Sequence, residues 1–139
     1  MSSWNDNAIS EFRAVDGKSG RWGRNLVIMH TIGAKTGQER IAPVMGLPDD
    51  ETRRAWTIVA SKGGAPENPA WYYNLLANPE FDVEAFITDG IQTVPVRARE
   101  LHDAEYQAAW DRMTAVAPGF ADYQARTNRT LPIFRLERV

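Results

Sequence analysis

The stretch FDVEAFITDGIQTVPVRARE, residues 81–100, decides the fold. Its first part alternates Phe81, Val83, Ala85 and Ile87 with mostly polar neighbours, which is the period of a strand with one buried face. Thr88-Asp89-Gly90 follows, and Asp-Gly is a preferred sequence for a tight hairpin turn. The remaining residues, 91–100, supply the return strand. The stretch therefore predicts a half-buried antiparallel pair of strands.

Further strand candidates lie on either side of this pair. Upstream they span residues 25–31, 40–47 and 55–61, and downstream residues 131–136 supply a last one. The turn residues Pro48-Asp49-Asp50 separate two of the upstream strands, and no role is expected for the 49–54 turn beyond lying at a rim. At least six antiparallel strands joined mainly by hairpins predict a mainly β, α+β chain with flanking helices. This order is typical of a small antiparallel barrel and not of a doubly wound sheet.

Residues 1–24 are expected to form a helix and a connector that precede a barrel domain of residues 25–139. Apolar residues recur at helical spacing before the helix ends near Asp16-Gly17, namely at Trp4, Ala8, Phe12 and Val15. We expect this stripe to pack on the domain. Because it contains bulky aromatic residues, a weak peripheral membrane contact stays open as an alternative, although Asp6 and Glu11 reduce the attraction to anionic lipid.

Two further helices are expected. In the first, Asn68 and Pro69 have the residue types preferred for the N-cap and the first helical position, and Asn78-Pro79 ends the helix. In the second, Asp103 is the expected cap and Pro118-Gly119 the end. The apolar stripe of the second helix is Tyr106, Trp110, Met113 and Ala117, and a short aromatic segment follows at residues 120–126.

Composition excludes several classes of protein. With 139 residues, 43% hydrophobic content and a net charge of -2, the chain predicts one globular domain with a substantial core and no nucleic-acid partner. The absence of cysteine excludes disulfide scaffolds, thiolate zinc sites and thiol nucleophiles, and it suits a reducing cytoplasm. No stretch resembles a signal peptide or reaches the ~20 apolar residues of a membrane span. We therefore expect a cytoplasmic protein.

Two loops carry residues suited to binding an anion. The stretch VASKGGAPENPAWYYN, residues 59–74, runs from the end of a strand through a lysine-glycine loop with exposed amides into an aromatic-rich helix. The other loop, GAKTGQER at residues 33–40, carries Lys35, Thr36 and Arg40. For either loop alone, a solvated turn that bears ordinary surface cations is the favoured interpretation. Together they favour a site for a large anionic cofactor with a flat ring.

Common catalytic arrangements are missing. His30 and His102 stand far apart without metal-binding spacing, so no metal site is expected. No Gly-x-Ser-x-Gly motif surrounds Ser61, and GAKTGQER does not match a Walker loop. Cofactor-binding loops without an evident acid, base or nucleophile are typical of proteins in which a redox cofactor supplies the chemistry.

Four stretches, in this order along the chain, carry a family resemblance: HTIGAKTGQERIAPV (30–44), VASKGG (59–64), NPAWYYNLLANP (68–79) and PGFADYQARTNRTLPI (118–133). They resemble the deazaflavin-dependent nitroreductase family, the F420-dependent quinone reductases, over nearly all of residues 26–133. The resemblance implies an FMN-binding split-barrel-like fold, that is, a split β-barrel. It also implies that the barrel binds coenzyme F420, an 8-hydroxy-5-deazaflavin with a phosphate and an oligoglutamate tail. The implied reaction passes a hydride from the reduced cofactor to a quinone or, incidentally, to a nitroaromatic compound.

The resemblance also implies the site residues. Ser61 at the ring edge and Tyr123 over the ring are the implied catalytic residues. On the substrate side stand Met45, Phe120 and Arg126, where nitroimidazole-reducing members are tyrosine-rich, so a quinone is favoured over such a prodrug. The implied cofactor-binding residues are Lys35, Thr36, Gly37, Arg40, Ile41, Ala42, Pro43, Val44, Val59, Ala60, Ser61, Lys62, Ala70, Trp71, Asn74 and Tyr123.

Structural roles stay open for several of these residues. At least one of Trp71, Tyr72 and Tyr73 is expected in the core, since three successive helical residues cannot share a face. Two other functions also stay open. One is a non-catalytic F420-binding carrier or protective protein, and the other is an FMN-dependent split-barrel oxidoreductase or a split barrel with a non-redox ligand such as a fatty acid or haem product. The basic path from Lys35 through Arg40 to Lys62 favours a cofactor with an extended acidic tail over FMN.

Overall fold

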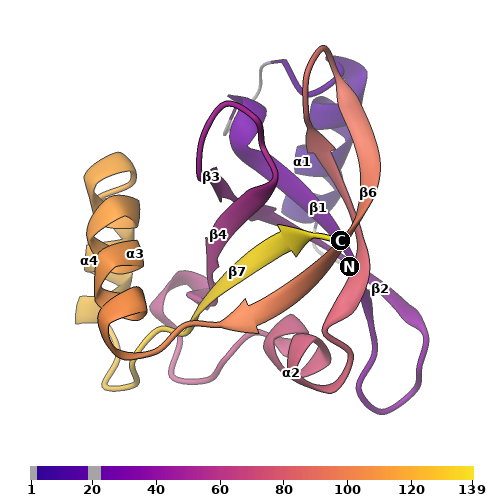
Figure 1. The fold of residues 1–139 in the computed structure, drawn as a ribbon. Coiled ribbons are helices and arrows are strands. Elements are labelled where there is room, and N and C mark those ends of the chain that lie inside the picture. Colours follow the sequence, from indigo (N-terminus) through magenta and orange to yellow (C-terminus); the bar gives the residue numbers. More distant parts are fainter. Residues whose placement is uncertain (1–2, 19–22) are drawn as a thin grey trace.

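The computed structural model describes residues 3–18 and 23–139, with side chains from Asn5 on, and its body is a seven-stranded antiparallel sheet (Figure 1). The strand order is β2-β1-β5-β6-β7-β4-β3. Its members are β1 (Leu26–Ile32), β2 (Glu39–Met45), β3 (Leu47–Pro48), β4 (Ala55–Val59), β5 (Glu80–Phe86), β6 (Ile91–Glu100) and β7 (Ile133–Arg138). The mainly β, split-barrel fold expected from the sequence is confirmed.

The two edges of this sheet meet at one residue. Strands β2 and β3 are the first and last in the sheet order, yet only Gly46 separates them along the chain. The sheet must therefore curl until its edges adjoin, which makes a half-barrel. A Cβ atom at Gly46 would lie 2.7 Å from Val27 Cγ2 and 3.3 Å from Trp56 Cβ, so the tight corner requires glycine.

The hairpin predicted from residues 81–100 is present. β5 pairs with β6 in a register that places Phe81 opposite Val96 and Phe86 opposite Ile91. The amide of Ile87 donates to the carbonyl of Gly90 at 3.1 Å and closes the turn. Phe86, which breaks the alternation, is buried because the guanidinium groups of Arg24 and Arg53 lie over its ring.

Strand β1 is buried on both faces, which explains its continuous apolar sequence. Val27 and Met29 point into the main core with Trp56. On the other face, Leu26 and Ile28 pack against Phe12 of the N-terminal helix α1 (Ser3–Ala14), as expected for that helix. Ala8 is also buried, but Val15 is exposed because the helix ends at Ala14. The side chain of Trp4 and residues 19–22 of the connector lie outside the described part of the chain.

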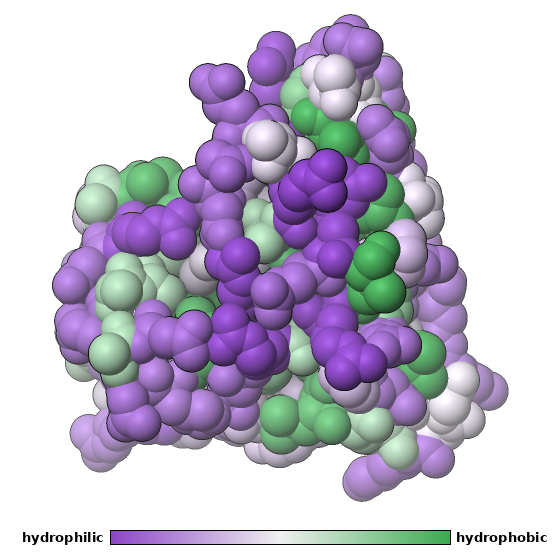
Figure 2. Space-filling model, viewed as in Figure 1, coloured by the Kyte–Doolittle hydropathy of each residue, from purple (hydrophilic) through white to green (hydrophobic). Residues whose placement is uncertain are grey.

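Three more helices and two 3-10 turns complete the structure: α2 (Ala70–Ala77), α3 (Asp103–Val116), α4 (Gly119–Ala125), η1 (Gly23–Asn25) and η2 (Lys62–Gly64). Helices α3 and α4 lie together at one flank of the sheet, away from α1 (Figure 1). Figure 2 shows a mostly hydrophilic face with hydrophobic residues in separate patches. No helix in the described ranges is both long and apolar enough to cross a bilayer.

Both predicted N-caps are wrong. Pro69 occupies the cap position of α2, and the side-chain oxygen of Asn68 accepts a hydrogen bond from Arg129 Nη1 at 2.7 Å instead. The charged guanidinium is a stronger donor than a helix amide and takes this oxygen. For α3 the cap position is His102, and Asp103 has a φ of 55° where a cap requires extended backbone.

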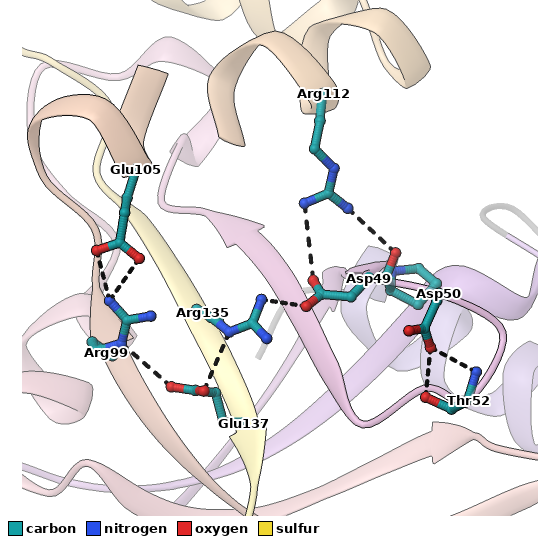
Figure 3. A network of polar contacts seen from close by, with 9 residues as sticks. Asp49, Asp50, Thr52, Arg99, Glu105, Arg112, Arg135 and Glu137 are labelled. Atoms are coloured by element: carbon teal, nitrogen blue, oxygen red, sulfur yellow. Dashed lines mark hydrogen bonds and ion pairs between the residues drawn. The ribbon is translucent and has the colours of Figure 1, made fainter. Parts of the chain in front are cut away.

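A network of charged side chains ties α3 and the 49–54 turn to β6 and β7 (Figure 3). Glu137 lies 3.3 Å from both Arg135 and Arg99, and Arg99 continues to Glu105 of α3 at 3.0 Å. Asp49 of the turn accepts from Arg135. A single exposed ion pair contributes little to stability. We therefore infer that the main role of the network is to orient α3.

Candidate functional site

The candidate site consists of two adjoining hollows that share Ala42 and Trp71 in their linings. The first has a volume of about 460 Å³ and lies between β2, the loop after β4, and α4. The second has a volume of about 500 Å³ and lies between the 33–36 loop, the start of β2, and α2. Curling of the sheet therefore brings the two loops chosen from the sequence to one groove.

The first hollow is mostly apolar. β2 supplies four of its lining residues, Ala42, Pro43, Val44 and Met45, and Val59 and Phe120 close other sides. Its polar members are Ser61, Lys62 and Tyr123, together with Asn5 from α1. Hydrophobic surfaces with a few convergent polar groups are the usual lining of a site for a flat organic ring.

The second hollow is cationic. Lys35 and Arg40 line it with exposed side chains, beside Thr36. Neither cation forms an ion pair with a carboxylate within residues 3–18 and 23–139, since Arg40 donates only to Gln38 Oε1 and the Glu39 carbonyl. Both charges are therefore available to an anionic ligand.

Asn74 of α2 holds the 33–38 loop in place. Its Oδ1 accepts from the amide of Ala34 at 2.9 Å, and its Nδ2 lies 3.4 Å from Thr31 Oγ1. The side chain is 9% exposed. Asn74 thus lines the second hollow while its amide oxygen is already used by the loop backbone.

The loop after β4 turns through left-handed backbone and is internally bonded. Lys62, Gly63 and Gly64 have φ angles of 46°, 63° and 84°, which lie in the left-handed region. The amides of Gly64 and Ala65 donate to the carbonyls of Ser61 and Lys62, so these two amides are not free for a ligand. Lys62 Nζ lies 2.9 Å from Glu67 Oε1, and this hydrogen bond holds the pKa of Glu67 below its usual value.

Helix α4 covers the first hollow. Phe120 and Tyr123 point into it with their rings edge to face and their centroids 6.0 Å apart. The helix sits directly on the loop, because a Cβ atom at Gly64 would lie 2.7 Å from the carbonyl oxygen of Tyr123. The close approach requires glycine at this position.

Most of the site residues chosen from the sequence line the hollows, and three do not. Gly37 forms the turn of its loop with a φ of 69°, Ala60 is fully buried, and the guanidinium carbon of the exposed Arg126 lies over the Tyr123 ring, 5.6 Å from its centroid. Sequence reasoning missed several residues at or near the site, among them Asn5 and Arg129. Asn5 had no recognisable signal, whereas Arg129 stands in the closing motif without any expected role.

His30 belongs to a separate cluster on the outer face of the sheet. Its Nε2 lies 2.6 Å from Glu84 Oε2, and Arg13 of α1 donates to the other oxygen of Glu84 at 2.9 Å. Burial acts to raise the pKa of Glu84, but the hydrogen bonds from Arg13 and His30 outweigh it and the pKa lies below its usual value. The cluster fastens α1 to β1 and β5. Within the described residues, no group of three or more His, Cys, Asp or Glu could hold a metal ion.

Comparison with known proteins gives one consistent result. A family model described as F420H(2)-dependent quinone reductase matches residues 5–138. An F420H(2)-dependent quinone reductase of Mycobacterium tuberculosis is 35% identical over 130 residues, which cover 88% of this chain and 83% of the relative. The solved structure of an F420-H2 dependent reductase, FDR-A, is 37% identical with a TM-score of 0.69, over 82% of this chain and 95% of that one. HutZ, the heme storage protein from Vibrio cholerae, shares only the fold, at 14% identity and a TM-score of 0.58 over 96% of this chain and 89% of HutZ.

Proposed function

Because the chain belongs to the F420H(2)-dependent quinone reductase family, we propose that its two adjoining hollows hold coenzyme F420 and that a quinone meets the cofactor ring beneath α4. The protein is an oxidoreductase that uses reduced F420 to reduce quinones. One observation carries the proposed placement of the cofactor: an apolar hollow and a cationic hollow adjoin and share Ala42 and Trp71 in their linings.

The residues present fit this cofactor. A flat ring matches the apolar side formed by β2, and an acidic tail matches Lys35 and Arg40, which have no carboxylate partner among the described residues. FMN carries a single phosphate and would leave part of the second hollow unused. We therefore favour F420 over FMN as the ligand of this groove.

When bound, reduced F420 supplies a hydride to the quinone. The protein's own contribution is to orient the reactants and to stabilise charge. We assign the Ser61 hydroxyl to a hydrogen bond at the ring edge, where negative charge develops during the reaction. Phe120 and Tyr123 line the same hollow and would exclude water from a bound ring, and a drier site strengthens such hydrogen bonds.

The substrate side favours quinones over nitroaromatic compounds. Met45 and Phe120 line it without a hydroxyl group, so they give a quinone ring an apolar surface but cannot orient a nitro group. Nitroaromatic reduction is then an incidental activity.

We propose that α1 serves as a wall of the site and not as a membrane anchor. Its Phe12 is 1% exposed and packs on the sheet, so this aromatic residue is not available to lipid. Arg13 of the same helix forms an ion pair with Glu84. We place the enzyme in the cytoplasm with its quinone as the small-molecule partner.

Titration with F420 and with FMN, followed by stopped-flow oxidation of reduced F420 on addition of menadione, tests the proposal. Tighter binding of F420 with rapid, quinone-dependent oxidation is the expected result. Binding without oxidation would favour the carrier function, and tighter binding of FMN would contradict the assignment of the second hollow to an acidic tail.

A further inference from the structure

Arg129 lies between α4 and β7 along the chain, and its guanidinium donates hydrogen bonds to the loop that follows β4. Nε donates to the carbonyl of Ala65 at 2.9 Å, and Nη2 donates to that of Ser61 at 2.8 Å. Nη1 donates to the carbonyl of Ala60 at 3.1 Å and to Asn68 Oδ1 at 2.7 Å. One side chain therefore holds both ends of the loop that carries Ser61 and Lys62.

The backbone of the same residue is held by α4. Gln124 Nε2 donates to the carbonyl of Arg129 at 2.7 Å, and Gln124 Oε1 accepts from the amide of Leu131 at 3.0 Å. Gly64 meanwhile contacts the backbone of Tyr123. Arg129 is thus hydrogen-bonded to two elements that line the first hollow, the Ser61–Lys62 loop and α4.

Arg129 forms no salt bridge in the described part of the chain, although, in addition to the hydrogen bond from Lys62, its positive charge helps to lower the pKa of nearby Glu67. All four of its acceptors are neutral carbonyl or amide oxygens, and no salt bridge to a carboxylate is formed. A planar guanidinium with several fixed donors suits such a divergent set of acceptors, whereas a lysine ammonium does not. The side chain is only partly exposed, so solvent screens its charge incompletely.

We propose that Arg129 is a positioning residue of the reductase with two separable effects. Its hydrogen bonds fix the loop that presents Ser61 and Lys62 and set the distance from this loop to α4. Its charge, which no salt bridge in the described residues neutralises, adds to the attraction for the acidic cofactor. The second effect rests on the proposed function, and the first is a property of the protein alone.

Two substitutions separate the effects. Arg129→Lys keeps the charge and loses the planar donor set, while Arg129→Gln loses both. Arg97→Gln is the control for charge, because Arg97 is exposed on β6 and its one ion pair among the described residues is with Glu80. Thermal unfolding of each variant identifies any that fails to fold.

The first measurement is hydrogen exchange of the 61–65 amides without cofactor, which does not depend on the proposed function. Faster exchange in both Arg129 variants but not in Arg97→Gln is expected. Exchange at the wild-type rate in Arg129→Lys and Arg129→Gln would overturn the positioning role.

The second measurement is F420 affinity by fluorescence titration at several salt concentrations, with kcat and KM for menadione. We expect Arg129→Gln to weaken F420 binding about tenfold and to reduce its salt dependence. Arg129→Lys should keep the wild-type salt dependence and lower kcat. Wild-type affinity and salt dependence in Arg129→Gln would overturn the electrostatic effect, and a wild-type protein that does not bind F420 would instead overturn the proposed function.

Discussion

The contact between Gly64 and α4 gives the sharpest prediction, because its neighbour Gly63 provides a matched control. Both glycines have positive φ angles, 63° and 84°. A Cβ atom at Gly63 would meet nothing within 4 Å, whereas one at Gly64 would lie 2.7 Å from the Tyr123 carbonyl oxygen and 3.0 Å from Arg126 Cβ. Alanine therefore adds backbone strain at both positions but a steric clash only at Gly64.

The two costs can be estimated separately. Left-handed backbone costs an L-residue about 1–2 kcal/mol, so Gly63→Ala should lose about that much stability. Gly64→Ala adds an overpacking cost of about 1–3 kcal/mol, because the clash involves backbone that cannot rotate away. For a chain of 139 residues, each kcal/mol lowers Tm by about 3–4 °C. We expect Tm to fall by roughly 3–8 °C for Gly63→Ala and by at least 3 °C more for Gly64→Ala.

Thermal unfolding followed by circular dichroism measures both changes. Steady-state kinetics with menadione, far below either Tm, should show a higher KM in Gly64→Ala than in Gly63→Ala, because only the former displaces α4 from the first hollow. Equal Tm losses in the two variants, or a larger loss in Gly63→Ala, would refute the packing of α4 on the loop.

Three further predictions concern single side chains. Lys62→Ala should weaken F420 binding in a fluorescence titration while Tm stays unchanged. Glu67→Gln should strengthen F420 binding, because it frees the Lys62 ammonium from its ion pair. Unchanged F420 affinity in both variants would show that Lys62 is not part of the site. Asn5→Ala should raise KM for menadione about threefold or more with no change in F420 affinity, and a weaker affinity for F420 would assign Asn5 to the cofactor side instead. The pKa of Glu84 is lowered in the folded protein, so its stabilising contribution is present at neutral pH and is lost as pH falls below the ordinary value of 4.5. Urea unfolding at pH 7 and pH 3.5 should therefore show a smaller loss of stability in Glu84→Gln than in the wild type, and an equal loss would show that the Arg13–Glu84 pair does not contribute.

Local features of the fold could be predicted from the sequence, and features that depend on distant residues could not. The β5–β6 hairpin needs only alternation and an Asp-Gly turn within one stretch of twenty residues. The prediction that Asn68 caps α2 was wrong because Arg129, far along the chain, donates a hydrogen bond to the side-chain oxygen of Asn68. Nothing near residue 68 signals that competitor.

The same limit applies to the site. Loop composition identified Lys35, Arg40 and Lys62 as residues for an anion, and the family resemblance supplied their grouping. Which of them share a hollow depends on how the sheet curls, a property of strand pairings such as β4 with β7 that join distant residues. Asn5 shows this limit most clearly. An asparagine near the start of an amphipathic helix gives no sign in the sequence that its side chain lines a cavity.

The closing of the sheet at Gly46 also bears on aggregation. The two strands that this glycine joins, β2 and β3, are the sheet's edges, and each contains a proline, Pro43 or Pro48. Proline offers no amide hydrogen to an incoming strand, and β3 is only two residues long, so neither edge is a good template for strand addition from another molecule. The corner that shapes the groove thus also protects the folded chain from edge-to-edge polymerisation. Self-association of this chain should therefore use side-chain surfaces or exchanged segments, and not extension of the sheet.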